Sequence, residues 1–224
     1  MNFTYTAYTP YVPHKMQNHM SEFVAVCEFM NTAGQAIYSK PLDLQQQVAV
    51  VTLRRALIVE EVKELAAALA ENDNIEIVDA LIDILYVTWG AYAALGLQYQ
   101  PVNLKLKLDS FISDLLVFAD IHGTHDEITE ALNSIIALVG QYCDVYHVNR
   151  AECFKAIHEN NMTKFCDTIE EAEMTMSKYS KDPRYVGVCY VKKNNKYVVL
   201  DGKGKVLKSA NYKPVLLRNV IKFC

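Results

Sequence analysis

The sequence predicts a mainly α-helical protein, an antiparallel helical bundle followed by a small antiparallel β meander. Apolar residues recur at three- and four-residue spacings over most of the first 180 residues, as on helix faces. Short runs of turn residues, such as Asn72 to Asn74, separate these periodic segments. After Pro183 the chain becomes rich in β-branched and aromatic residues. We therefore expect an extended lead-in (1–16), a helical domain (17–180) and a basic, β-rich appendage (181–224).

The helices can be placed in order. The first is predicted from Gln17 to about Gly34. The second runs from Asp43, a suitable N-cap, to Glu71, and the third follows at once from Ile75 to Gly96. Further helices are expected at about 104–120, 125–147, 150–163 and 168–179. Segments 185–191, 197–200 and 206–207, separated by turn residues, predict the strands of the meander.

Composition places the chain among ordinary globular proteins. Of its 224 residues, 51% are hydrophobic and 21% are charged, which excludes disorder as the main state. The start of the sequence lacks the basic and apolar regions of a secretory signal, and the six dispersed cysteines form no zinc or disulfide pattern. We expect a cytoplasmic product with free thiols.

One apolar stretch, Ile77 to Tyr99, has the length of a membrane span. It carries Asp79 and Asp83, and each would be costly in lipid. We therefore expect a buried core helix and no membrane partner.

Charge is distributed unevenly along the chain. Residues 1–180 hold 11 Lys and Arg against 24 Asp and Glu, whereas residues 181–224 hold 11 against 2. Such a basic tail suits a nucleic-acid arm, a surface that docks on the acidic body, or a lid for an anionic ligand.

The second helix carries acids within an apolar stripe. At 100° per residue, Glu61 and Glu64 share a face with Leu53, Leu57 and Ala68. Glu60 lies on the outer edge of that stripe. For this segment alone, a solvated helix face is the more common explanation.

The third helix cannot be explained as a solvated face. Its acids Glu76, Asp79 and Asp83 project from one side of a nearly all-apolar helix, together with Tyr86 and Gly90. Buried carboxylates without a partner cost several kcal/mol or take up protons. A cation must therefore compensate them.

The short turn at Asn72 to Asn74 predicts that the two helices are antiparallel neighbours, which brings the two sets of acids face to face. Oxygen donors without His or Cys suit a hard cation, Mg²⁺ or alternatively Mn²⁺. A di-iron bundle would need a Glu-x-x-His motif, which the sequence lacks.

These motifs resemble those of the all-α nucleoside triphosphate pyrophosphohydrolases, which include MazG and phosphoribosyl-ATP pyrophosphohydrolase. Residues 60–64 match the family motif Glu-Glu-x-x-Glu in full. The second motif, Glu-x-x-Asp, fits in two registers. Glu76 to Asp79 matches literally, whereas the context after Asp83 favours that residue, with Ala80 at the Glu position.

The resemblance continues towards the C-terminus, to most of residues 20–214. Residues 158–164 are similar to a late Asn-Met-Ser-Lys element of phosphoribosyl-ATP pyrophosphohydrolase-like members, many of them phage-borne. Residues 204–214 are similar to the C-terminal extension of the same members.

The resemblance implies the all-α fold of this superfamily and cleavage of a nucleoside triphosphate between its α and β phosphates, by an activated water. It implies Mg²⁺ as cofactor. The implied metal ligands are Glu61, Glu64, Asp79 and Asp83, with Glu76 in reserve. Glu60 and Glu61 are the predicted catalytic residues, and Glu60 would orient or deprotonate the water.

Five further residues are predicted to bind the substrate: Asn161, Lys164, Lys205, Lys208 and Asn211. Asn161 would supply an amide to base or sugar, and the lysines would reach phosphates. The resemblance also implies a homodimer or larger homo-oligomer, and the host cytoplasm for a phage-borne member. The base stays open, and the phage-like tail favours a deoxyribonucleotide.

Two alternatives remain. A non-catalytic, Mg²⁺-dependent nucleotide-binding or regulatory module would explain Ala80 at a motif position. A nucleic-acid-binding protein with a basic tail would explain the charge asymmetry. We rank nucleic acid as an improbable partner, because it leaves the buried acids unexplained.

Overall fold

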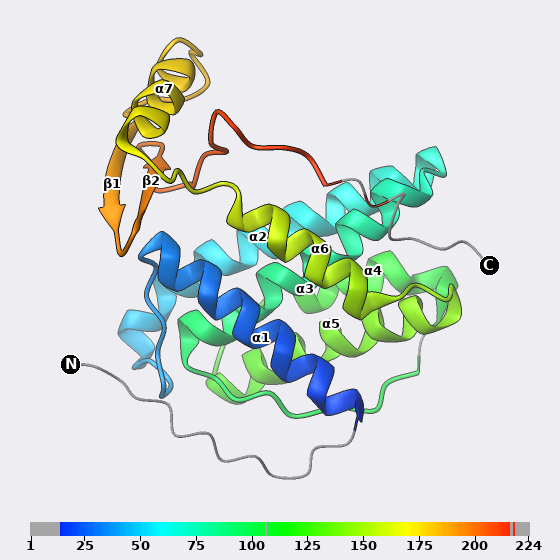
Figure 1. Cartoon of the computed structure of the whole chain (residues 1–224). Coiled ribbons are helices and arrows are strands. Elements are labelled where there is room, and N and C mark those ends of the chain that lie inside the picture. Colours follow the sequence, from blue (N-terminus) through cyan, green and yellow to red (C-terminus); the bar gives the residue numbers. More distant parts are fainter. Residues whose placement is uncertain (1–13, 106, 216, 218–224) are drawn as a thin grey trace.

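The structure, a computed structural model, describes residues 14–105, 107–215 and 217 (Figure 1). Its helices are α1 (His14–Ala33), α2 (Leu44–Glu71), α3 (Asn74–Leu95), η1 (Leu108–Ser110), α4 (Phe111–Ala119), α5 (His125–Val145), α6 (Arg150–Met162) and α7 (Ile169–Ser180). Its strands are β1 (Cys189–Lys193) and β2 (Lys196–Leu200). The mainly helical fold with a small C-terminal antiparallel sheet is confirmed.

Local capping determines where the two acid-bearing helices begin and end. The Asp43 carboxylate accepts hydrogen bonds from the backbone N–H groups of Gln45 and Gln46, so α2 begins there. Asn72 ends α2 in the left-handed conformation, and the Asp73 side chain caps α3 directly afterwards. A connection this short turns α3 back along α2.

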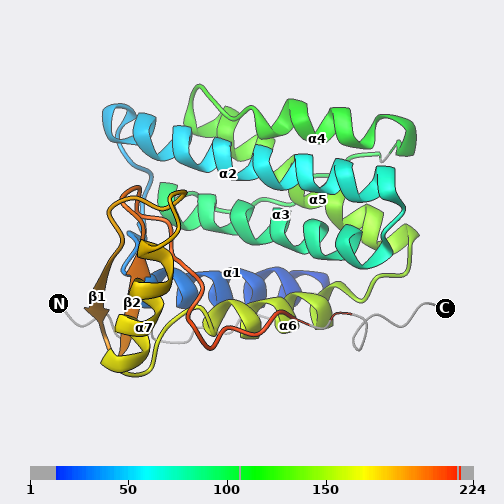
Figure 2. The same cartoon turned by 90° about the horizontal axis from the view of Figure 1, so that it is seen from above.

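Helix α3 is the centre of the bundle. It contacts α2, α1, α5 and α6, and Figure 2 shows it between α2 and the layer of α1 and α6. Trp89 and Tyr92 are almost fully buried along it. The helix is long and apolar enough to cross a membrane, but 78% of its most apolar window is buried inside the protein. The expectation of a core helix is therefore confirmed.

The C-terminal part forms a separate small core. Strands β1 and β2 pair antiparallel, from Cys189 opposite Leu200 to Lys193 opposite Lys196, and α7 packs on them (Figure 1). The predicted third strand at 206–207 is reduced to a single bridge between Leu200 and Val206. The intervening turn, with Gly204 at φ 82°, returns the chain beside β2 for only one residue pair.

Two predicted boundaries differ from the structure. The helix expected over 104–120 consists only of η1 and α4, because leucine and lysine alternate over 104–108 with a two-residue period that does not suit a helix. Helix α1 begins at His14, inside the predicted lead-in. The rest of that lead-in, residues 1–13, lies outside the described residues, and the domain boundaries stay a prediction.

Candidate functional site

Four carboxylates interact electrostatically across the contact between α2 and α3, and we call this group the acid seam: Glu61, Glu64, Asp79 and Asp83. Glu61 interacts most strongly with Asp83 among the neighbouring charges, and Glu64 acts on both aspartates. The antiparallel turn thus brings the two predicted sets of acids face to face.

Burial and mutual repulsion make ionisation of the acid seam costly. Burial, and then the Asp83 charge, raise the pKa of Glu61 to about 8. Burial, and then Asp79, raise the pKa of Asp83 to about 7. The pKa of Asp79 is raised as well, by burial and then by Glu76. A site of this kind favours whatever cation can enter it.

Two lysines from distant parts of the chain supply positive charge to the seam. Lys164, just after α6, is partly buried beside Phe29, with its Nζ 5.9 Å from the ring centroid. Burial lowers the pKa of Lys164 although Asp83 and Glu61 favour its charged form. Lys208 acts on Asp79 and Asp83 from the appendage.

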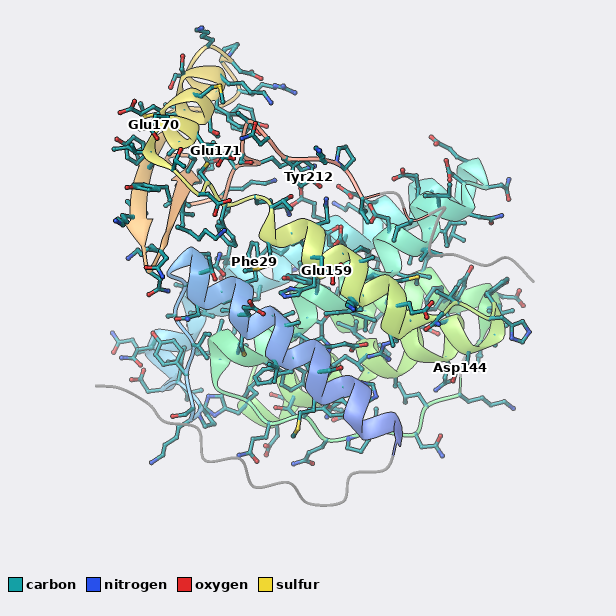
Figure 3. The ribbon with its side chains drawn as sticks, in the orientation of Figure 1. Phe29, Asp144, Glu159, Glu170, Glu171 and Tyr212 are labelled. Carbon is teal, nitrogen blue, oxygen red and sulfur yellow. The ribbon has the colours of Figure 1, made fainter. Side chains whose placement is uncertain are left out.

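The chain after the sheet is held against the bundle by hydrogen bonds, and we call residues 205–215 the C-terminal segment. The Tyr212 hydroxyl donates to Asn160 Oδ1 at 2.6 Å, and Figure 3 shows Tyr212 on this segment above α6. The Ser209 hydroxyl donates to the Thr163 carbonyl at 3.0 Å. These bonds place Lys208 near the seam, its Nζ 4.6 Å from the Tyr212 ring centroid.

The other predicted residues lie around this centre. Glu60 is exposed at the outer edge of the stripe and acts on Glu61. Lys205 is exposed but close enough to Lys164 to influence it, whereas Asn211 is exposed. Asn161 is buried, with 7% of its surface exposed.

A hollow of about 240 Å³ opens at the end of the seam near the α2–α3 turn. Its carboxylates are Glu64, Glu71, Glu76 and Asp79. Sequence reasoning missed Glu71, although its seven-residue spacing from Glu64 places it on the same helix face. Within the described ranges, no three His, Cys, Asp or Glu side chains are already gathered as a metal-ligand cluster.

Sequence reasoning also missed a hydrogen-bonded chain behind the seam. The Tyr86 hydroxyl, one turn beyond Asp83, is hydrogen-bonded to His158 Nδ1 at 3.0 Å, and His158 Nε2 lies 3.3 Å from Glu28 Oε2. Burial raises the pKa of the Tyr86 hydroxyl, while a hydrogen bond from Asn161 lowers it. The i, i+3 spacing of Asp83 and Tyr86 places Tyr86 on the acid-bearing face of α3, but it gives no signal for the contact with His158.

The carboxylates fit a hard divalent cation chemically. Carboxylate oxygens from two helices, with Glu61, Asp79 and Asp83 partly buried and Glu64 exposed, suit Mg²⁺ or Mn²⁺ better than a soft metal. The positions of Lys164 and Lys208 add a surface for anionic oxygens beside these carboxylates. Together they form a site in which a polyphosphate can meet both a cation and ammonium groups.

Comparison with known proteins agrees with this geometry. Residues 26–108 match the family described as phosphoribosyl-ATP pyrophosphohydrolase. An uncharacterized protein of Acanthamoeba polyphaga mimivirus is 29% identical in an alignment 234 residues long. The alignment spans 86% of this chain and 92% of that protein. No solved structure matches the chain significantly. The matched family points to hydrolysis of a phosphoric anhydride. Residues 26–108, which carry every predicted metal-ligating carboxylate, are therefore similar to the phosphoribosyl-ATP pyrophosphohydrolase family, within the MazG-like all-α nucleoside triphosphate pyrophosphohydrolases.

Proposed function

We propose that the protein hydrolyses a ribo- or deoxyribonucleoside triphosphate to the monophosphate and pyrophosphate, with Mg²⁺ or Mn²⁺ as cofactor. The observation that carries this proposal is the acid seam faced by lysines from α6's end and from the C-terminal segment. Water attack forms a bond to the α phosphorus and breaks its bond to the oxygen that bridges to the β phosphate.

The metal would be held by Glu61, Glu64, Asp79 and Asp83, with Glu76 at the edge. When bound, the cation neutralises charge on phosphate oxygens. This role suits the seam, because the same positive charge would offset the cost of burial and the repulsion, which together raise the pKa values of Glu61 and Asp83.

The chain's own groups perform the remaining tasks. Lys164 and Lys208 hold phosphate oxygens, and Lys205, which is exposed like Lys208 and acts on Lys164, adds long-range attraction. Glu60, exposed at the edge, orients the water or accepts its proton. The buried Asn161 and the exposed Asn211 offer amides to the sugar or base.

The test is pyrophosphate release from a panel of ribo- and deoxyribonucleoside triphosphates, with Mg²⁺, with Mn²⁺ and with a chelator. We expect metal-dependent release of pyrophosphate and monophosphate, abolished by Glu61→Gln. Glu130→Gln, which changes an exposed acid of α5, is the matched control and keeps full activity. Release that persists in chelator or in Glu61→Gln would contradict the proposal.

A regulatory nucleotide-binding module is the second candidate. It is favoured by one observation, the buried Ala80 in the wall of the acidic hollow, at a position where one register of the motif requires Glu. It predicts Mg²⁺-dependent nucleotide binding without pyrophosphate release.

We propose that the protein is a homodimer that works in the cytoplasm. Light scattering after gel filtration measures the mass of the assembly and tests this proposal.

A further inference from the structure

Arg54 is a buried cation without a counterion among the described residues. It lies in the middle of α2 with 8% of its surface exposed. Its Nε has no hydrogen-bond partner, and its Nη2 has only the Met30 sulfur, 3.9 Å away. Burial lowers the pKa of Arg54 to about 10, with no neighbouring charge contributing. A charge removed from water without a partner is costly, so a compensating ligand is expected.

The opposite helix makes room for this guanidinium. Gly90 lies inside α3, where glycine is unfavourable for helix stability. A Cβ at Gly90 would lie 2.7 Å from Arg54 Nη1, closer than such atoms normally approach. Gly90, which is unfavourable in a helix, thus contacts the unpaired charge of Arg54. Two destabilising features at one contact are expected where a residue is retained for function.

Arg54 also lies in register with the acid seam. It precedes Glu61 by two helical turns on α2, and Gly90 follows Asp83 by two turns on the antiparallel α3. Two turns correspond to about 10 Å along the helix axis. A nucleotide held by its phosphates at the acids and extended along the α2–α3 contact would direct its base towards Arg54.

We propose that Arg54 recognises the substrate base, by donating two hydrogen bonds to a base edge with two adjacent acceptors, which makes a guanine nucleotide the preferred substrate. This inference rests on the proposed function, because the phosphates must be anchored at the acid seam.

Hydrogen-bond chemistry makes guanine the best match. The guanidinium is a planar fork of donors with no acceptor. Guanine presents O6 and N7 as adjacent acceptors and pairs with arginine through both, whereas adenine presents a donor, its amino group, beside N7. Arginine therefore attracts guanine and opposes adenine at the same place.

Met30 occupies the position that the base would take. Its sulfur is a weak acceptor, so it satisfies the guanidinium poorly. Its side chain is unbranched and flexible, and can adopt another rotamer when a base enters. The neighbouring Val26 side chain, which also faces Gly90 and like Met30 is 1% exposed, would contact the ring of the base once Met30 has moved.

The experiment measures affinity for the non-hydrolysable α,β-methylene analogues of dGTP and dATP with Mg²⁺, by calorimetry, and pyrophosphate release from dGTP and dATP. The variants are Arg54→Met, Arg54→Lys, Gly90→Ala and the control Arg55→Met, which removes an exposed arginine paired with Asp120. We expect wild type and the control to prefer guanine by about 10- to 100-fold, and Arg54→Met to lose that preference. Gly90→Ala, which displaces the guanidinium, is expected to weaken it.

The melting temperature of the Arg54→Met variant distinguishes a role of Arg54 in base recognition from a structural role. Removal of an unpaired buried charge leaves the melting temperature equal or higher, so Arg54→Met should melt no lower than wild type. A lower melting temperature with unchanged base preference would overturn the proposal, as would a wild type without guanine preference or without binding. Guanine-selective binding lost in Arg54→Met, with no pyrophosphate release from any triphosphate, would support Arg54 while refuting hydrolysis.

Discussion

A single buried carboxylate, Glu22, and the four carboxylates of the acid seam contact α3 or belong to it, and their surroundings differ. Glu22 of α1 is 2% exposed and accepts hydrogen bonds from Trp89 Nε1 at 2.9 Å and from Arg150 Nε at 2.8 Å and Nη2 at 2.5 Å. The acid seam, at the other end of α3, has no arginine and faces only Lys164 and Lys208 among the described cations that act on Asp83.

The difference separates a structural charge from a functional one. Around Glu22 every hydrogen bond is made within the fold, so α1, α3 and α6 are joined and no ligand is needed. At the acid seam, burial and then mutual repulsion raise the pKa values of Glu61 and Asp83, as expected of carboxylates proposed to take an added cation. Four predictions test this comparison.

The largest expected effect is on turnover. Asp83→Asn should lower kcat by about 10³-fold, because it removes a charged oxygen that we propose binds the cation and that would be worth several kcal/mol in the transition state. In chelator at pH 8 the same variant should melt higher than wild type, since one repelling charge is gone. Steady-state assays and thermal melts measure the two quantities. A variant that is both inactive and less stable than wild type would show that Asp83, like Glu22, has a structural role.

Glu22→Gln should have the opposite profile. Loss of this charge leaves Arg150 partly buried without its partner, which costs about 3–5 kcal/mol and lowers the melting temperature by roughly 10 °C. Activity at 20 °C should change little. Differential scanning calorimetry provides the measurement, with exposed Glu152→Gln on α6 as control. An unchanged melting temperature would refute the structural role.

The third prediction concerns pH in the absence of metal. Folding raises the pKa of Glu61 from about 4.5 to about 8, so below pH 4.5 this group is protonated in both states and has no effect. Between these values the unfolded state ionises first, so stability falls as pH rises. The melting temperature in chelator should therefore drop by several degrees from pH 5 to 8, and Glu61→Gln should flatten that slope. An equal slope in the variant would contradict the assignment.

The smallest effects are expected in the C-terminal segment. Lys208→Met should raise KM by about tenfold, because Lys208 acts on Asp79 and Asp83, whereas Lys205→Met should raise it only about two- to threefold, because Lys205 acts on Lys164. Initial rates at fixed ionic strength test this order. Equal effects, or a larger effect at Lys205, would show that the segment attracts substrate only over long range.

Sequence reasoning found the acids because period and burial are local properties. The 3.6-residue repeat places Glu61, Asp79 and Asp83 on interrupted apolar faces, and the capped turn determines that these faces meet. The contacts of Tyr86 with His158, and of Arg54 with Gly90, join segments that are far apart in the sequence. Such contacts depend on how helices cross, which periodicity does not specify. For the same reason the reduced third strand could not be foreseen from composition.

The hydrogen bonds that hold the C-terminal segment also have a consequence for biosynthesis. The seam carboxylates are complete once Asp83 has been translated, whereas Lys208 follows 125 residues later, a delay of roughly 6–25 s at typical translation rates. During that interval the seam carboxylates have at most Lys164 as a cationic neighbour from the chain, so protons or cations from the surroundings supply the remaining positive charge. A ribosome-bound chain can therefore acquire metal before the segment that contacts the phosphates has been synthesised.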